Sequence, residues 1–204
     1  MIRVSAILGM AALIVGMVAP FSQGQAPRKS IMVVDFVDRT GTWAGTRDVI
    51  TTRVISKFRD DQALRVLPRD RVQAALQEAK AEPAGIIDWE DAQKVAKALE
   101  ADYVVMGEVT VFNQQKTGGC VPVVGCAYTD TASVALHGKI LKVATGQFVA
   151  EPTTEVKKQQ GSGSISGVPG IGTVTVENID SQLIGKAALE AVEKFVAAAK
   201  LKFN

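Results

Sequence analysis

The residue types that carry out catalysis are few and scattered in this 204-residue sequence. Two carboxylates, Asp35 and Asp38, flank Phe36 at the end of an apolar run, a spacing that could place a general acid beside a general base. The single histidine, His137, has no acidic neighbour in the sequence to orient it, and no serine stands in a Gly-x-Ser-x-Gly turn. We therefore interpret the two carboxylates as turn-capping groups and expect that the protein is not an enzyme.

The two cysteines, Cys120 and Cys126, lie within one short glycine-containing segment. An exported chain meets an oxidising compartment, which favours a disulfide between them, with two free thiols as the alternative. Two thiols and one histidine are too few soft ligands for a closed zinc site. The sequence predicts neither a metal nor a cofactor.

A glycine- and serine-rich run occupies Gln159 to Asp180. Its Gly161-x-Gly163 pair suggests a phosphate-binding loop, but it contains no lysine and leads into alternating Thr and Val instead of a helix. We interpret residues 157–172 as a hairpin or loop that projects from the sheet. Trp43 and Trp89 both lie next to predicted helix starts, where an aromatic side chain usually packs over the end of the core, and we expect Trp43 to be the more exposed of the two. The candidate partner contacts are Trp43, Gly163, Val168, Pro169 and Ile171.

The N-terminal residues have the order of a secretory signal peptide. Arg3 precedes an apolar run from Val4 to Val18, which is followed by Pro20 and small or polar residues. We expect a signal peptide over residues 1–24, cleaved after residue 24 or 26, with an uncleaved membrane anchor as the alternative. No cysteine near the cleavage region could carry a lipid. Residues 25–204 are then one periplasmic domain, and the net charge of +2 gives no reason to expect a nucleic-acid partner.

Apolar periodicity predicts an α/β fold, an α+β sandwich in which helices cover a mixed β-sheet. Ile50, Val54 and Phe58 recur at helical spacing, and a long helix closes the chain. The predicted strands are 31–37, 64–67, 103–112, 131–143, 147–156 and 173–176. The predicted helices are 46–59, one from 70, one from 88 and one from 180.

Four segments in this order resemble the CsgG family, the periplasmic domain of the curli secretion channel and its relatives. They are IMVVDFVDRTG, LRVLPRDRVQAALQEA, AKALEADYVVMGEVT and GKILKVATGQFV. A similar domain occurs in LpoB-type activators of peptidoglycan synthases and in the N-terminal domain of TolB. The resemblance implies a CsgG-like periplasmic domain over most of the mature chain.

The resemblance also implies two segments that rearrange into membrane hairpins in the channel, here residues 113–131 and 155–179. Neither has the alternating apolar pattern of a lipid-facing strand. We therefore expect a secreted, non-enzymatic binding or assembly module of the cell envelope, linked to secretion or surface-structure assembly. Its expected partner is an envelope protein, and a homo-oligomer remains open. The alternatives are an outer-membrane secretion pore subunit of curli type, with membrane contact not favoured, and an LpoB-like synthase activator.

Overall fold

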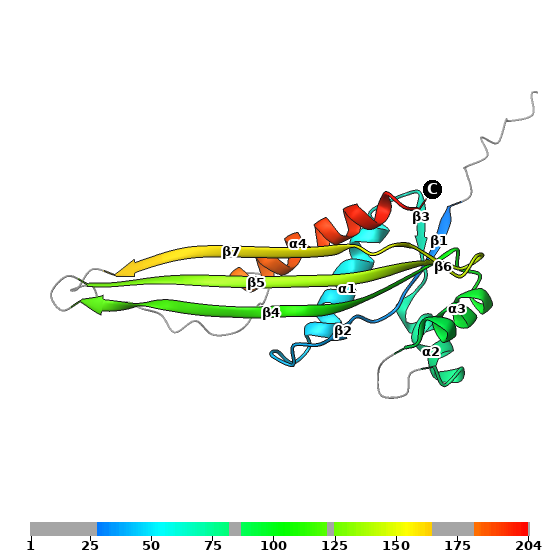
Figure 1. Cartoon of the computed structure of the whole chain (residues 1–204), viewed down its shortest axis with the longest axis horizontal. Helices are drawn as coiled ribbons and strands as arrows, with labels where there is room; N and C mark the ends of the chain where they lie inside the picture. Colours follow the sequence, from blue (N-terminus) through cyan, green and yellow to red (C-terminus); the bar gives the residue numbers. More distant parts are fainter. Residues whose placement is uncertain (1–27, 82–86, 122–124, 165–181, 204) are drawn as a thin grey trace, which may run out of the picture.

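The computed structural model describes residues 28–81, 87–121, 125–164 and 182–203. In these residues a seven-stranded mixed sheet has the order β3-β1-β4-β5-β6, with β2 beside β4 and β7 beside β5 (Figure 1). The strands are β1 (Lys29–Val33), β2 (Val37–Asp38), β3 (Leu64–Val66), β4 (Tyr103–Val121), β5 (Gly125–Lys142), β6 (Gln147–Ala150) and β7 (Thr153–Ser164). The helices are α1 (Thr46–Arg59), α2 (Arg69–Glu78), α3 (Trp89–Ala98) and α4 (Leu183–Lys200).

Both faces of the central sheet are covered by helices, which confirms the predicted fold class. Alternate residues of a strand point to opposite faces. Ile31 and Val33 of β1 therefore join the core beneath α1 and α4, whereas Met32 joins a second core beneath α2 and α3. β1 pairs in parallel with β3 and β4. The continuous apolar run of β1 is typical of a strand that is buried on both faces.

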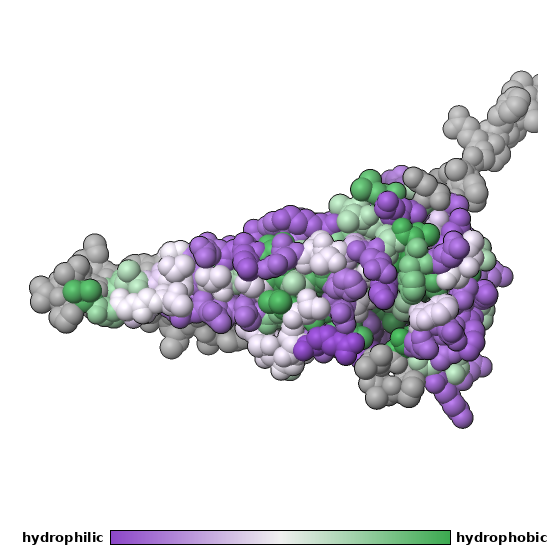
Figure 2. Space-filling view, viewed as in Figure 1, coloured by the Kyte–Doolittle hydropathy of each residue, from purple (hydrophilic) through white to green (hydrophobic). Residues whose placement is uncertain are grey.

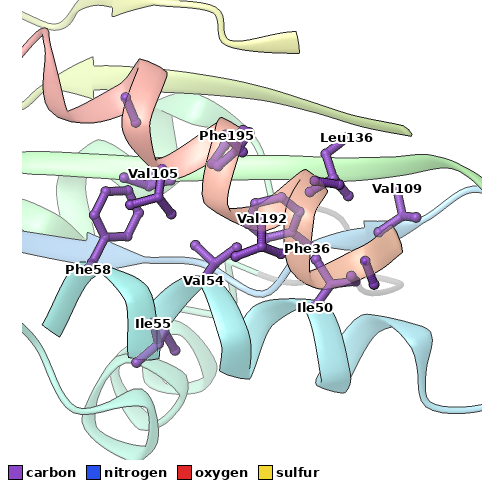
Figure 3. Close-up of a cluster of buried hydrophobic side chains, with 14 of the residues drawn as sticks. Phe36, Ile50, Val54, Ile55, Phe58, Val105, Val109, Leu136, Val192 and Phe195 are labelled. Carbon is purple, nitrogen blue, oxygen red and sulfur yellow. The ribbon is translucent and has the colours of Figure 1, made fainter. Parts of the chain in front are cut away.

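The larger core lies between the sheet and the helix pair α1 and α4 (Figure 3). Phe36 and Phe195 meet there edge to face. The sheet residues beneath the two rings are glycines, Gly107 in β4 and Gly138 in β5, which pair with each other. The hydroxyl of the buried Thr51 in α1 accepts the Phe36 N–H at 2.9 Å, which ties α1 to the end of β1.

β4 and β5 continue far beyond the helices. A bulge at Thr110 marks the transition, and after it the two strands stay paired to Val121 and Gly125. β7 runs beside β5 as far as Ser164. We call residues 113–121, 125–133 and 157–164 the arm; it extends away from the body in Figure 1.

The arm corrects two predicted strand boundaries. The expected strand 103–112 continues to Val121, and the expected strand 131–143 begins at Gly125. The added residues are mainly polar or glycine, so no apolar alternation marks them. Backbone pairing that continues from the body holds them in the sheet instead.

The expected single strand 147–156 is also wrong, because it is divided into β6 and β7. Pro152 lies between them and has no N–H to donate to a ladder, while its carbonyl accepts the Gly138 N–H at 2.9 Å. The predicted strand 173–176 and the signal peptide lie outside the described residues. None of the four described helices is both long enough and apolar enough to cross a membrane.

Candidate functional site

Asp35 is a buried ion-pairing centre. Its carboxylate accepts two hydrogen bonds from Arg69, at 2.7 and 2.6 Å, and one from Gln73 at 2.9 Å. Burial alone would raise the pKa of Asp35, but the hydrogen bonds and charge of Arg69, helped by Gln73 and Arg47, outweigh it and lower that pKa. A carboxylate held in its ionised form by this many donors joins β1 to α2 and is a poor proton donor.

Asp38 has different partners and does not work with Asp35. Its Oδ1 accepts the N–H of Thr40 at 2.8 Å and the Thr40 hydroxyl at 2.7 Å. This is an Asx turn, which agrees with our interpretation of Asp38 as a turn-capping residue. The same interpretation is wrong for Asp35, because its partners come from helices that follow much later in the sequence.

His137 has an acidic neighbour that the linear sequence does not reveal. Glu108 lies opposite it across β4 and β5, with 3.8 Å between Glu108 Oε1 and His137 Nδ1. The other carboxylate oxygen of Glu108 accepts a hydrogen bond from Arg39 Nε at 2.9 Å. These three side chains form a polar row across the sheet. On its other side, His137 pairs with Thr153 of β7.

A groove of about 460 Å³ contains this polar row. It lies where the first residues of α3 approach the sheet, and we call it the α3 groove. Its second wall is aromatic, because Trp89 and Phe148 meet edge to face with ring centroids 6.1 Å apart. The lining residues are Val37, Arg39, Ile87, Asp88, Trp89, Met106, Gly107, Glu108, His137, Gly138, Lys139 and Phe148.

The order of exposure of the two tryptophans is the reverse of the one that we predicted. Trp43 is half-buried against the larger core and packs edge to face on Phe112, with ring centroids 6.2 Å apart. Trp89, the first residue of α3, is 40% exposed. Helical spacing could not reveal this, since a residue in the first turn of a helix can lie beyond the edge of the sheet that the helix covers.

The end of the arm carries a disulfide between Cys120 and Cys126, as predicted. The two cysteines pair directly across β4 and β5. Tyr128 lies beside them, with its hydroxyl 3.1 Å from Cys120 Sγ, and the Lys116 ammonium lies 4.7 Å from the centre of the Tyr128 ring. The disulfide therefore closes the hairpin close to its exposed end.

The proposed contact residues of the glycine run divide into two groups. Gly163 belongs to β7 and pairs with Ala127 of β5. Val168, Pro169 and Ile171 lie outside the described residues. Within the described residues, no group of three or more His, Cys, Asp or Glu side chains is arranged to hold a metal ion.

The fold places this chain among α/β proteins whose helices cover a sheet that extends as a projecting arm. The family model for the curli production assembly/transport component CsgG matches residues 18–201. The chain therefore belongs to the CsgG family. No curated protein matches the chain at a significant level.

Several solved structures are similar to this chain at low sequence identity. The hypothetical protein CT253 from Chlamydia trachomatis is 13% identical, with a TM-score of 0.53 over 86% of this chain and 98% of that one. The LpoB C-terminal domain from Salmonella enterica is 14% identical, with a TM-score of 0.46 over 66% and 86% of the two chains. PelC from Paraburkholderia phytofirmans, solved as a dodecamer, is 12% identical, with a TM-score of 0.45 over 85% and 90%. At 13% identity, the similarity to CT253 supports a shared fold and no shared function.

Proposed function

We propose that this chain is a periplasmic, non-enzymatic assembly module of the cell envelope, which docks a protein partner through its arm. The family supports an envelope role, because its model is named for an assembly and transport component. The arm carries the proposal.

The arm has no core of its own. From Gln115 to Val121 every residue of β4 is exposed, and residues 126–131 of β5, which face 115–120, are half-buried or exposed. The visible face of the arm in Figure 2 is mainly hydrophilic or intermediate in hydropathy. A three-stranded sheet usually needs an apolar face for stability. Contact with another molecule would bury the arm and add to the stability that the continued strand pairing and the disulfide provide.

The edges of the arm offer a way to bind. Among the described strands, β2 pairs with the outer edge of β4 only at Glu108 and Val109, and no described strand pairs with the outer edge of β7. Unpaired N–H and C=O groups along such edges can accept a further strand. An extended segment of an envelope protein fits this surface.

A photo-crosslinking amino acid at Gln115 in the arm tests the proposal, with the same amino acid at the exposed Leu189 of α4 as the matched control. Crosslinking in intact cells should join one defined envelope protein to position 115 and not to position 189. Equal labelling at both positions, or none at position 115, would contradict docking through the arm.

A pore subunit is a second candidate, because residues 113–121 and 125–133 each have about the length of a membrane-crossing strand. The residue pattern does not favour a pore, because a membrane strand needs one apolar face. Here Gln115 and Thr117 on one face and Gln114 and Lys116 on the other are all polar. Fractionation separates the two candidates. A monomer in the soluble periplasmic fraction excludes the pore, and a large detergent-extracted oligomer excludes the soluble module.

A further inference from the structure

The aromatic wall of the α3 groove is unusual for a surface that serves only to cover the core. Trp89 is 40% exposed and Phe148 is 38% exposed, although both are large apolar side chains. They come from different elements, α3 and β6, and meet at the groove. The Lys139 ammonium lies 5.3 Å from the centre of the Phe148 ring. Exposed aromatic side chains gathered in a hollow commonly mark a binding site.

The charged side chains that line the groove offer donors and acceptors in balanced numbers. Arg39 and Lys139 bring two positive charges, and Glu108 and Asp88 bring two negative ones. Arg39 and Glu108 are already bonded to each other at 2.9 Å. Asp88 makes no side-chain hydrogen bond to cap α3, although it occupies the N-cap position. The two positive and two negative side chains cancel, so the groove has no net charge that would favour an anionic or a cationic ligand.

Beyond the groove, the same face of the sheet carries the Val111, Ala135 and Glu155 row, whose Glu155 pairs with Lys157, and then mainly amide and hydroxyl side chains. His137 is followed along this face of β5 by Ala135, Ser133 and Thr131. Cross-strand partners extend the pattern into rows. Two of these rows are Asn113, Ser133 and Lys157, and Gln115, Thr131 and Gln159. Amide and hydroxyl side chains of this kind exchange hydrogen bonds with neutral hydroxyl groups.

We propose that the α3 groove binds a neutral saccharide. A pyranose ring has an apolar C–H face and a rim of hydroxyl groups. Its face fits against Trp89 and Phe148, where the electron-rich ring faces attract C–H groups. Its hydroxyl groups donate to Glu108 and Asp88 and accept from Arg39 and Lys139. A chain of such sugars continues over the polar rows of the arm. This binding is independent of the protein docking proposed above.

Nuclear magnetic resonance of the full chain tests the proposal through the indole N–H signal of Trp89, which is identified by its loss in Trp89→Phe. The probes are cellotetraose and chitotetraose as neutral sugars, tetragalacturonate as an acidic sugar, and an extended octapeptide rich in Gln and Val. We expect the Trp89 signal to shift and saturate with at least one neutral tetrasaccharide, with a Kd of about 1 mM or tighter. A response to chitotetraose alone would indicate a cell-wall-like, N-acetylated glycan. A response to cellotetraose would indicate another neutral glycan.

Variants locate the binding. Their affinities are measured from the backbone amide signals of the groove residues Gly107 and Gly138, because Trp89→Ala and Trp89→Phe have no Trp89 indole signal. Trp89→Ala should weaken it at least about tenfold, and Trp89→Phe should keep it within about threefold, because the aromatic face remains. Phe148→Ala should also weaken it several-fold. Leu189→Ala, which removes another exposed apolar side chain far from the groove residues, should not change it. Circular dichroism confirms that each variant is folded. The proposal is overturned if neither neutral sugar saturates the Trp89 signal, if the acidic sugar or the peptide binds more tightly, or if Trp89→Ala binds normally.

Discussion

Phe36 and Phe195 pack edge to face, with their ring centroids 5.4 Å apart, directly over a pair of glycines in the sheet. A Cβ atom on Gly107 would lie 2.3 Å from Phe36 Cε1, and one on Gly138 would lie 2.4 Å from Phe195 Cε2. Real Cβ atoms do not approach other atoms so closely. The contact between the two rings thus depends on the absence of side chains in β4 and β5.

Substituting these glycines should destabilise the fold. Gly107→Ala and Gly138→Ala should each lower the free energy of unfolding by about 2 kcal/mol, because a fully buried ring must move to admit a methyl group. Urea denaturation measures the change. The matched control is Gly161→Ala in β7, where no atom lies within 4 Å of the added Cβ, and it should stay within about 0.5 kcal/mol of the wild type. Equal stabilities for Gly138→Ala and Gly161→Ala would contradict this account of the core.

The two carboxylates near the end of β1 should respond differently to the same change. Asp35→Asn should lower the free energy of unfolding by about 2 kcal/mol, because Arg69 loses its buried partner and keeps only its contact with Asp48. Asp38→Asn is the matched control, since an amide oxygen can accept the same two bonds from Thr40. Urea denaturation compares the two. A larger loss for Asp38→Asn would show that Asp35 is not the main ion-pairing centre.

Acid should remove the contribution of Asp35. Its folded-state pKa lies below the ordinary value of 3.8, so the ionised form stabilises the fold above that value, and this stabilisation disappears as the pH falls through the lowered pKa. The difference in free energy of unfolding between the wild type and Asp35→Asn should be constant from about pH 7 to about pH 5 and shrink below about pH 4. A difference that instead grew on acidification would mean that the folded-state pKa of Asp35 is raised.

The disulfide should act locally. Converting Cys120 and Cys126 to Ser should increase hydrogen exchange of arm amides near residues 118–121 and 126–129 by at least about tenfold, because the hairpin loses its covalent closure. The amides of β1 should exchange as before, since β1 lies in the body. Hydrogen exchange with mass spectrometry measures both regions. The wild-type chain should also gain about two hydrogens in mass on reduction. Unchanged exchange in the arm would show that the disulfide does not hold the hairpin closed.

The two tryptophans should differ in their effect on stability. Trp43→Ala should lower the free energy of unfolding by about 2 kcal/mol, because its ring packs on Phe112 and the larger core. Trp89→Ala should cost less than about 1 kcal/mol, since much of its ring faces solvent. Urea denaturation of both variants tests this order. A larger loss of stability for Trp89→Ala than for Trp43→Ala would contradict the packing described for the two rings.

The sequence predicted the body well because apolar spacing determines it. Residues 46–59 form α1 as expected, and Ile50, Val54 and Phe58 are fully buried on its inner face. The long final helix and the mixed sheet also follow from such spacing. In each case one apolar face had to be buried against another element, and that requirement is visible in the linear order of residues.

The arm and the α3 groove could not be predicted in this way. The arm forms because backbone pairing continues past the body. Its residues are mainly polar or glycine, so the sequence shows no apolar alternation that would predict strands there. The groove joins Trp89 to Phe148, and the ion-pairing centre joins Asp35 to Arg69. The members of each pair are far apart in sequence, so only the fold brings them together.

The continuity of β4 and β5 has a mechanical consequence. Both strands run without a break from the disulfide end of the arm into the middle of the body, where β4 pairs with β1. A pull on that end along the strand axis is carried by two covalent backbones and loads the neighbouring hydrogen bonds in shear, many at once. A sideways pull would instead open those bonds one after another. The molecule should thus resist tension along its long axis far better than tension across it.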